Sequence, residues 1–407
     1  MKVFQVALGI LAAIGGFVDI GDIVFNISAG AIFGYDLLWV VVVGVFGIIV
    51  YSEMCGRVAA VSKKAVFDAV RERVGFGTGL LTLLAAELVT LLTLTAELGG
   101  VAICLQLLSA VAYRWLIVLG VAAVALVVWL TPFEWIERIF GYGGLCLLVF
   151  AGAAYKLHPD WSSVAHGFVP SIDTSDTLVY LFFAVGLLGA AMTPYEVYFY
   201  SSGAIEEGWT PKDLAVNRAN AIVGYGLGGI LSFLLMIVGA ALFLPHGIEP
   251  DTLGTVALGA EVPLGKIGLL LAIGGILFAV SGAAIDTLFA GAYNVAQFLG
   301  WEWGRYRTNA GAPRFTLAWM ALLVVALGIV MTGVDPVQLT EYAVIFSVVA
   351  LPLTYLPILL VANDRAYMGE HANGRLANAF GIGYFVLILV VSLTAIPLMI
   401  LTNVGQG

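Results

Sequence analysis

The sequence predicts an all-α membrane protein with about eleven transmembrane helices, in a single domain that covers residues 1–407. Of its 407 residues, 61% are hydrophobic and only 11% are charged, and the mean hydropathy is +1.05. A soluble domain normally carries roughly 25% charged residues, because its surface faces water. Polar residues divide the chain into apolar runs near the roughly 20 residues that cross a bilayer. The expected spans are residues 4–33, 37–55, 76–109, 113–131, 139–155, 177–202, 218–244, 264–299, 314–333, 337–362 and 377–402.

The composition argues against several other classes of protein. The net charge of −9 is opposite in sign to the basic surface of a nucleic-acid-binding protein. Cys55, Cys104 and Cys146 lie in or beside apolar runs, so no disulfide framework is indicated. The first apolar run continues directly into a segment with two carboxylates. We therefore interpret it as the first span rather than as a separate signal peptide.

The distribution of basic residues predicts the orientation in the membrane. With the N-terminus in the cytoplasm, only Arg114, Lys156 and Lys266 of the 17 Lys and Arg residues fall on the outer side. Such an excess of basic residues on one side is typical of cytoplasmic loops. An odd number of spans then places the C-terminus outside. We expect a multi-pass protein of the cell membrane, in a prokaryote the inner (plasma) membrane.

The segment V-D-I-G-D at residues 18–22 places two carboxylates inside the first span. Asp19 and Asp22 are the only charged residues between positions 3 and 33. Burying an ionised carboxylate in the bilayer costs at least about 2.5–3.5 kcal/mol, and a bound cation compensates this cost best. Gly21 lowers helix propensity by roughly 1 kcal/mol relative to Ala. The segment therefore predicts a helix that opens here, with a cation site formed by the carboxylates and freed backbone carbonyls.

A second interruption is predicted at residues 189–196, G-A-A-M-T-P-Y-E. Pro194 removes a helical hydrogen bond and clashes with the preceding turn. This segment belongs to the sixth span, as V-D-I-G-D belongs to the first. Interrupted helices at matching positions of two five-helix halves indicate an inverted-repeat transporter with a binding site at the bilayer midplane. We expect a first repeat over about 4–155, a second over about 177–362 and an additional helix over about 377–402.

The first of these segments resembles the NRAMP family of divalent-metal transporters, whose first helix carries the signature Asp-Pro-Gly-Asn. Asp19 and Gly21 match this signature, while Ile20 stands at the proline and Asp22 at the asparagine. T-A-E at 95–97 and N-D-R-A-Y-M-G-E at 363–370 resemble further segments of the family. The resemblance covers nearly the whole chain. It implies a LeuT-type inverted repeat of helices 1–5 and 6–10, with helices 1 and 6 broken.

The second segment resembles the family's sixth-helix motif, which reads Met-Pro-His. Pro194, Tyr198 and Ser201 match. Thr193 stands at the metal-binding methionine, and Ala190 stands at the residue that donates a backbone carbonyl. The resemblance therefore implies these metal ligands: Asp19, Asp22, Thr193 and the carbonyl of Ala190.

The departures from the family pattern favour a hard cation. Methionine sulfur suits transition metals, whereas Mg²⁺ takes oxygen ligands and keeps several waters. Thr193 replaces sulfur by oxygen, and Asp22 replaces an amide by a second carboxylate. With both changes, the chain resembles the magnesium-transporting branch of NRAMP-related proteins. We therefore expect it to carry Mg²⁺, with Mn²⁺ also carried. Met192 is displaced by one residue, which on a helix turns it by about 100° away from Thr193.

Proton coupling is expected to be absent. The family carries histidines on the sixth helix where this chain has Tyr195 and Tyr200, and an acid on the third helix where it has Leu94. Free tyrosine has a pKa near 10 and is a poor proton carrier at physiological pH. Glu97, Glu87 and Glu196 leave a different proton relay open. We expect the residues around the metal, with supporting or gating roles, to be Gly21, Glu97, Tyr195, Glu196 and Tyr200.

Structural interpretations of the same residues stay open. Asp22 is also suited to capping the second half of the first helix, and the Thr193 hydroxyl to bonding its own backbone. Glu87, Glu97 and Asp286 are also suited to joining helices through polar contacts.

Three other functions are weighed. An intramembrane aspartyl protease needs its carboxylates on separate helices, so no enzyme is expected. An amino-acid symporter of the same fold would bring a substrate carboxylate to the helix break, where two acids repel it. The ordinary proton-coupled Mn²⁺/Fe²⁺ importer of the NRAMP family is the main alternative. If the protein transports a divalent metal, the Mg²⁺ or Mn²⁺ ion is its substrate, and no cofactor is expected. The expected partners are divalent ions and the bilayer, with no nucleic acid and no obligate protein partner.

Overall fold

The computed structural model describes residues 18–109, 111–172, 174 and 176–405, and this part of the chain is helical without strands. Ten of its helical runs are long and apolar enough to cross a membrane. The described helices are α2 (Ile20–Phe33), α3 (Leu38–Ser62), α4 (Val66–Ser109), α5 (Tyr113–Leu130), α6 (Phe133–Gly144), η1 (Leu145–Leu148), α7 (Val149–Lys156), α8 (Trp161–His166), α9 (Thr177–Ala191), α10 (Pro194–Glu206), η2 (Pro211–Asp213), α11 (Leu214–Val238), η3 (Gly239–Phe243), η4 (Leu244–His246), α12 (Leu253–Leu299), α13 (Pro313–Val330), α14 (Pro336–Asn363), α15 (Arg365–Met368), η5 (Gly369–His371) and α16 (Arg375–Leu401).

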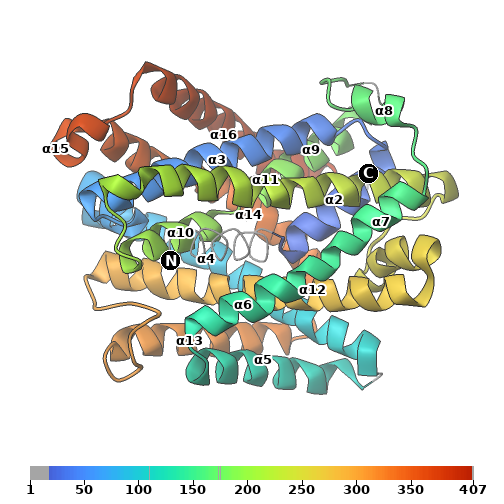
Figure 1. The fold of residues 1–407 in the computed structure, drawn as a ribbon, viewed down its shortest axis with the longest axis horizontal. Helices are drawn as coiled ribbons and strands as arrows, with labels where there is room; N and C mark the ends of the chain where they lie inside the picture. Colours follow the sequence, from blue (N-terminus) through green and yellow to red (C-terminus); the bar gives the residue numbers. More distant parts are fainter. Residues whose placement is uncertain (1–17, 110, 173, 175, 406–407) are drawn as a thin grey trace.

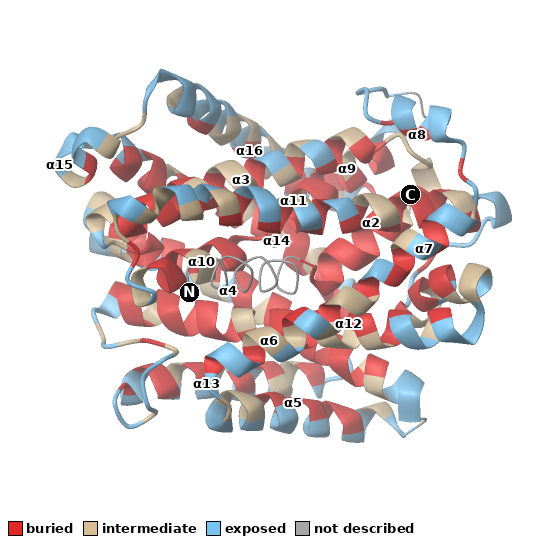
Figure 2. Cartoon of the chain, viewed as in Figure 1, coloured by how far each residue is buried: buried red, intermediate tan, exposed pale blue. Residues whose placement is uncertain are grey.

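The long helices run side by side along the longest axis of the molecule, with α15 at one end and α8 at the other (Figure 1). We call these two ends the α15 end and the α8 end. α4 packs against both α12 and α14 in the interior. α5, α13 and α16 lie at the periphery, where many of their residues are exposed (Figure 2). The exposed residues of α16 include Leu376, Leu393 and Ile400, as expected for a helix that faces lipid tails.

The predicted spans from 37–55 onward each coincide with an observed helical run. Two of them begin where a glycine adopts a left-handed conformation. The expected span 76–109 follows Gly75 (φ 77°) in α4, and 264–299 begins beside Gly265 (φ 71°) in α12. Helix continues on the other side of each glycine, from Val66 and from Leu253. Sequence analysis treated these additional segments as loops, because charged or polar residues interrupt them.

Both predicted helix interruptions fall at helix ends. α9 ends at Ala191 and α10 begins at Pro194, with extended backbone at Thr193 (φ −61°, ψ 122°). Proline suits this first position, because its missing N–H is not needed there. α2 begins at Ile20, directly after extended backbone at Asp19. The predicted first span, 4–33, lies partly outside the described residues, so only its second half is compared.

α2 is held by a close approach of two backbones. A Cβ atom added at Gly30 would lie 2.1 Å from the carbonyl oxygen of Met236, at the end of α11. A Cβ atom at Gly239, the first residue of the π-helix η3, would lie 2.2 Å from the carbonyl oxygen of Ile27. No side chain fits at either position unless a backbone moves. The two glycines therefore fix α2 against the end of α11.

We expect Gly30→Ala to push α2 away from Met236 and to cost about 1–3 kcal/mol, as overpacking typically does. Gly226→Ala is the matched control, because no atom lies within 4 Å of a Cβ at this half-buried glycine of α11. Tryptophan-fluorescence melting in detergent should show a lower apparent Tm for Gly30→Ala alone. Equal melting of both variants would contradict the close packing.

Candidate metal site

Asp19 caps the first described helix. Its backbone is extended (φ −90°, ψ 177°), and its Oδ1 accepts a hydrogen bond from the backbone N–H of Asp22 at 2.8 Å. The side chain is buried, and the carboxylate lies at the N-terminus of α2, where backbone N–H groups carry partial positive charge. The alternative that Asp22 is the capping residue is wrong, because Asp19 has that role.

Glu97 of α4 occupies the same helix end. Its Oε1 accepts from the backbone N–H of Ile20 at 3.1 Å. The residue is completely buried, and its second oxygen, Oε2, has no hydrogen-bond partner in the described chain. Two carboxylates from different helices therefore meet the free N–H groups of α2. Glu97 therefore shares the N-terminus of α2 with the predicted metal ligand Asp19.

Asp22 is held from two sides. Asn26 Nδ2, one turn further along α2, donates to its Oδ1 at 2.8 Å. Ser232 Oγ of α11 lies 2.9 Å from Oδ1 and 2.8 Å from Oδ2. Sequence analysis missed both partners. The i, i+4 spacing from Asp22 to Asn26 was a usable signal, whereas no spacing connects Asp22 with Ser232 210 residues away.

The sixth-helix residues are also joined to one another. The Thr193 hydroxyl donates to the carbonyl oxygen of Ala190 at 2.7 Å. This is the alternative in which the hydroxyl bonds its own backbone. A carbonyl oxygen and a hydroxyl oxygen each keep a lone pair after one such bond. The Thr193 hydroxyl and the Ala190 carbonyl, both predicted as metal ligands, therefore retain the capacity to bind a cation. Their hydrogen bond fixes the orientation of the two oxygens relative to each other.

Val344 of α14 is a shared neighbour of the two helix interruptions. A Cβ atom at Gly21 would lie 2.9 Å from Val344 Cγ2 and 3.1 Å from Asp19 Oδ1. A Cβ atom at Gly189, in the last turn of α9, would lie 2.8 Å from the Val344 carbonyl oxygen. The start of α2 and the end of α9 thus both lie against the same residue. Because Gly21 has no side chain, Val344 and the Asp19 carboxylate can both lie close to the start of α2.

The other predicted supporting residues separate into two groups. Tyr195 lies close to the Asp19 carboxylate and interacts with it electrostatically, and Glu196 is buried one residue further along α10. Tyr200 instead bonds to Asn217 of α11, at 3.0 Å to its carbonyl oxygen and 2.9 Å to its side-chain oxygen. Tyr200 therefore takes part in a contact between α10 and α11, with no hydrogen bond to Asp19 among those described.

The donor chemistry of this region is oxygen. No group of three or more His, Cys, Asp or Glu side chains among the described residues is arranged to hold a metal ion. A cation at Asp19 and Asp22 would therefore complete its shell with carbonyl and hydroxyl oxygens and with water. Such a donor set suits a hard divalent ion, which keeps several of its waters.

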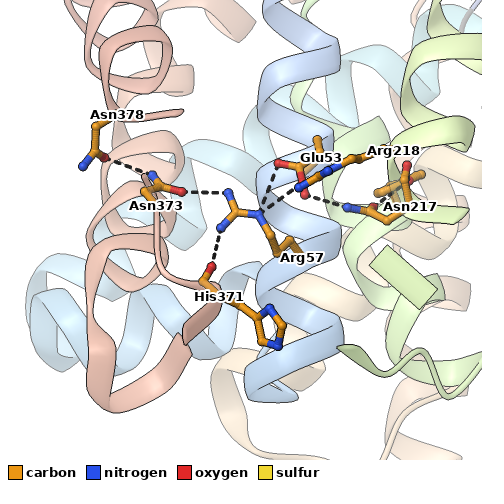
Figure 3. Close-up of polar contacts among 8 residues, drawn as sticks. Glu53, Arg57, Asn217, Arg218, His371, Asn373 and Asn378 are labelled. Carbon is orange, nitrogen blue, oxygen red and sulfur yellow. Dashed lines mark hydrogen bonds and ion pairs between the residues drawn. The ribbon is translucent and has the colours of Figure 1, made fainter. Parts of the chain in front are cut away.

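A polar cluster outside this region ties three segments at the α15 end (Figure 3). Arg57 Nε of α3 donates to Glu53 at 3.1 Å, and its terminal nitrogens donate to the His371 carbonyl and to Asn373 Oδ1 at 2.9 and 2.7 Å. Asn217 Nδ2 of α11 donates to the Glu53 carbonyl at 2.9 Å. The cluster borders a cavity of about 400 Å³. It joins α3 to α11 and to the segment before α16.

A second arginine cluster lies at the end of α10. The side chain of Arg305 is 2% exposed and lies 3.1 Å from Glu207, 3.7 Å from Glu206 and 3.7 Å from Glu137. Its guanidinium also stacks on the Phe133 ring, 4.1 Å from the ring centre. Arg305 therefore holds the end of α10 against α6.

Outside the spans, Arg73 forms a hydrogen-bonded ion pair with Asp364, directly before α15. This bond lowers the pKa of the Asp364 carboxyl below its usual value. The pair holds the segment before α15 to the beginning of α4. The pairing could not be predicted from the sequence, because the two residues lie 291 positions apart.

Comparison with known sequences decides the family. The family described as natural resistance-associated macrophage protein-like (Nramp) matches residues 9–397. The chain belongs to the Nramp family. Family members are transporters, so the chain is a transporter rather than an enzyme. The predicted family and the expected absence of enzymatic activity are thus confirmed.

Curated relatives cover almost the whole chain. A protein of Aeromonas hydrophila named divalent metal cation transporter MntH is 28% identical over 410 residues, which are 95% of this chain and 93% of that relative. A protein of the same name from Deinococcus radiodurans is 25% identical over 404 residues, covering 93% of this chain and 85% of the relative.

Solved structures confirm the predicted fold. The manganese transporter of Eremococcus coleocola, in complex with an aromatic bis-isothiourea compound, superposes with a TM-score of 0.80 at 20% identity, over 97% of this chain and 86% of that chain. MhsT in complex with L-phenylalanine gives a TM-score of 0.65 at 17% identity, over 96% of this chain and 98% of that chain. The fold is that of Nramp and LeuT-type transporters.

Proposed function

We propose that this transporter carries divalent metal cations across the cell membrane, chiefly Mg²⁺ with Mn²⁺ also carried. The observation that supports this most directly is the pair of buried carboxylates at the start of α2. Neither Asp19 nor Asp22 forms an ion pair with a basic residue within the described chain. A buried acid without a base needs a cation or a proton. Relatives named divalent metal cation transporters support the cation.

We assign the ion to the region between the two helix interruptions. Its proposed ligands are Asp19, Asp22, Thr193 and the Ala190 carbonyl, either directly or through water. All four supply oxygen, the ligand that hard ions prefer. Small residues around them, Gly21 and Ala191 among others, leave room for waters that a hard ion retains.

The proposed route is alternating access between two inverted repeats, over about 4–155 and 177–362. The left-handed glycines of α4 and α12 support this division, because they occur in the third and eighth spans, which correspond in the two halves. The N-terminus is assigned to the cytoplasm and the C-terminus to the outside. The arginine clusters at the α15 end are consistent with a cytoplasmic side there.

Manganese as the preferred ion is the second candidate. It is favoured by the structural relative that is itself a manganese transporter. The absence of a methionine at position 193 argues for Mg²⁺ instead, because Thr193 offers oxygen to the ion where a sulfur would favour transition metals. Oxygen-only coordination accepts both ions, so the two candidates differ in preference rather than in path.

The first test is removal of the carboxylates. We expect Asp19→Ala and Asp22→Ala proteins in liposomes to lose at least about 90% of Mg²⁺ and Mn²⁺ uptake, because a methyl group supplies no oxygen that offsets the ion's lost hydration. Asp251→Ala is the control, since Asp251 is an exposed loop residue. Uptake at the parent rate in both site variants would refute the assignment.

A change in metal selectivity tests whether Thr193 is a ligand of the ion. We expect Thr193→Met to shift preference from Mg²⁺ toward Cd²⁺ and Mn²⁺ by restoring a soft sulfur ligand, whereas Thr193→Ser keeps an oxygen and the parent preference. Competition of Cd²⁺ against Mg²⁺ uptake measures the shift. An unchanged ratio in Thr193→Met would mean that the residue does not face the ion.

Transport is proposed to proceed without stoichiometric proton movement. Tyr195 and Leu94 are buried where the family has a histidine and an acid. His158, His166, His246 and His371 lie in connections, in the short helix α8 or at the ends of short 3-10 helices. A pH-sensitive dye inside liposomes should stay constant when external Mg²⁺ or Mn²⁺ is added. Acidification that requires both metal and protein would contradict the proposal.

A further inference from the structure

Glu196 is a buried carboxylate without a partner. It lies in the first turn of α10, and 7% of its surface is exposed. Neither of its oxygens has a hydrogen-bond partner in the described part of the chain. Buried polar groups nearly always have a partner, and an unpaired buried charge is far more costly than an unpaired neutral group. Glu196 therefore requires an explanation that the other residues of α10 do not supply.

The position of Glu196 relates it to the metal site. It is the third residue of α10, and Thr193 is the residue that precedes this helix, so Glu196 lies within the first turn beyond that predicted ligand. Tyr200 follows Glu196 by four residues on the same face of α10 and bonds to Asn217. The face thus leads from the interruption between α9 and α10 toward the α15 end.

The charges around Glu196 are negative. Asp19, Asp22 and Asp286 all act electrostatically on its carboxylate. Arg305 is buried beside the end of α10. It is paired with Glu137, Glu206 and Glu207 and not with Glu196. The surroundings of Glu196 therefore attract a cation and offer it no competing base.

We propose that Glu196 forms a second, transient cation-binding position, one helical turn beyond Thr193. It would receive the hydrated divalent ion released from Asp19 and Asp22 and pass it toward the α15 end. Water would complete the coordination, since a single carboxylate is a usual anchor for hydrated Mg²⁺. The inference rests on the proposed function, because it takes the ion from the site proposed there.

Glu87 provides a matched comparison within the same protein. It is an acid of α4 that accepts a hydrogen bond from Asn294 of α12 at 3.1 Å. This bond gives Glu87 a role between helices that needs no ion. Glu196 has no such bond in the described part of the chain. Glu87 therefore serves as the control for a buried acid with a purely structural role.

The experiment separates equilibrium binding from turnover. Mn²⁺ and Mg²⁺ binding to purified protein is measured by calorimetry, and uptake is measured in liposomes. We expect Glu196→Gln to keep the equilibrium Kd within about threefold and to lower the maximal uptake rate about tenfold, one such factor being equivalent to about 1.4 kcal/mol. Glu87→Gln should keep both values within about twofold. Glu196→Asp, which keeps the charge, should recover part of the rate and serves if Glu196→Gln does not fold.

The outcomes distinguish the two proposals. Parent uptake by Glu196→Gln would overturn the second position and leave the proposed function intact. Equal loss of binding and uptake would place Glu196 in the main site and also overturn the second position. Asp19→Ala and Asp22→Ala measured in parallel test the proposed function itself, which fails if both retain binding and uptake. A rate loss at unchanged Kd, partly recovered in Glu196→Asp, supports the transient position.

Discussion

The helix end at Asp19 is the constraint on which the rest of the site depends. A helix that starts inside a membrane exposes backbone N–H groups that water cannot satisfy there. Two of these groups, on Ile20 and Asp22, are satisfied by Glu97 and Asp19. One of the two carboxylates that hold the helix end, Asp19, is thus also a proposed ligand of the ion. Because Asp19 Oδ1 is already engaged by the Asp22 N–H, a cation at Asp19 has to share that oxygen or use Oδ2.

The helical architecture follows closely from the sequence, because the cost of burying charge in lipid determines where spans end. The expected span 113–131 corresponds to α5, Tyr113–Leu130, and 337–362 to α14, Pro336–Asn363. The helices before Gly75 and Gly265 were missed for the same reason. Their polar residues resemble those of a loop, and only the backbone reveals that helix continues across the glycine.

The candidate site was less predictable, because spacing along a helix says little about partners on other helices. Asn26 could be placed near Asp22 from their i, i+4 separation, but Ser232 could not. The Thr193 hydroxyl shows a second limit. At the interrupted helix end the Ala190 carbonyl lacks its usual helical partner, and a nearby hydroxyl satisfies it. A hydrogen bond to the local backbone thus orients the Thr193 side chain, which the family resemblance had predicted as a metal ligand.

The acidic side chains of this protein differ in whether a base accompanies them. Glu53 pairs with Arg57, and three glutamates surround Arg305, all at the α15 end. Asp19, Asp22, Glu97 and Glu196 have no arginine or lysine partner among the described residues. Even around Arg305 the acids outnumber the base, so its single positive charge does not reverse the sign of the local potential. On the proposed route from the start of α2 along α10, a divalent cation would therefore remain in acidic surroundings, and the paired acids hold the helices together without closing that route electrostatically.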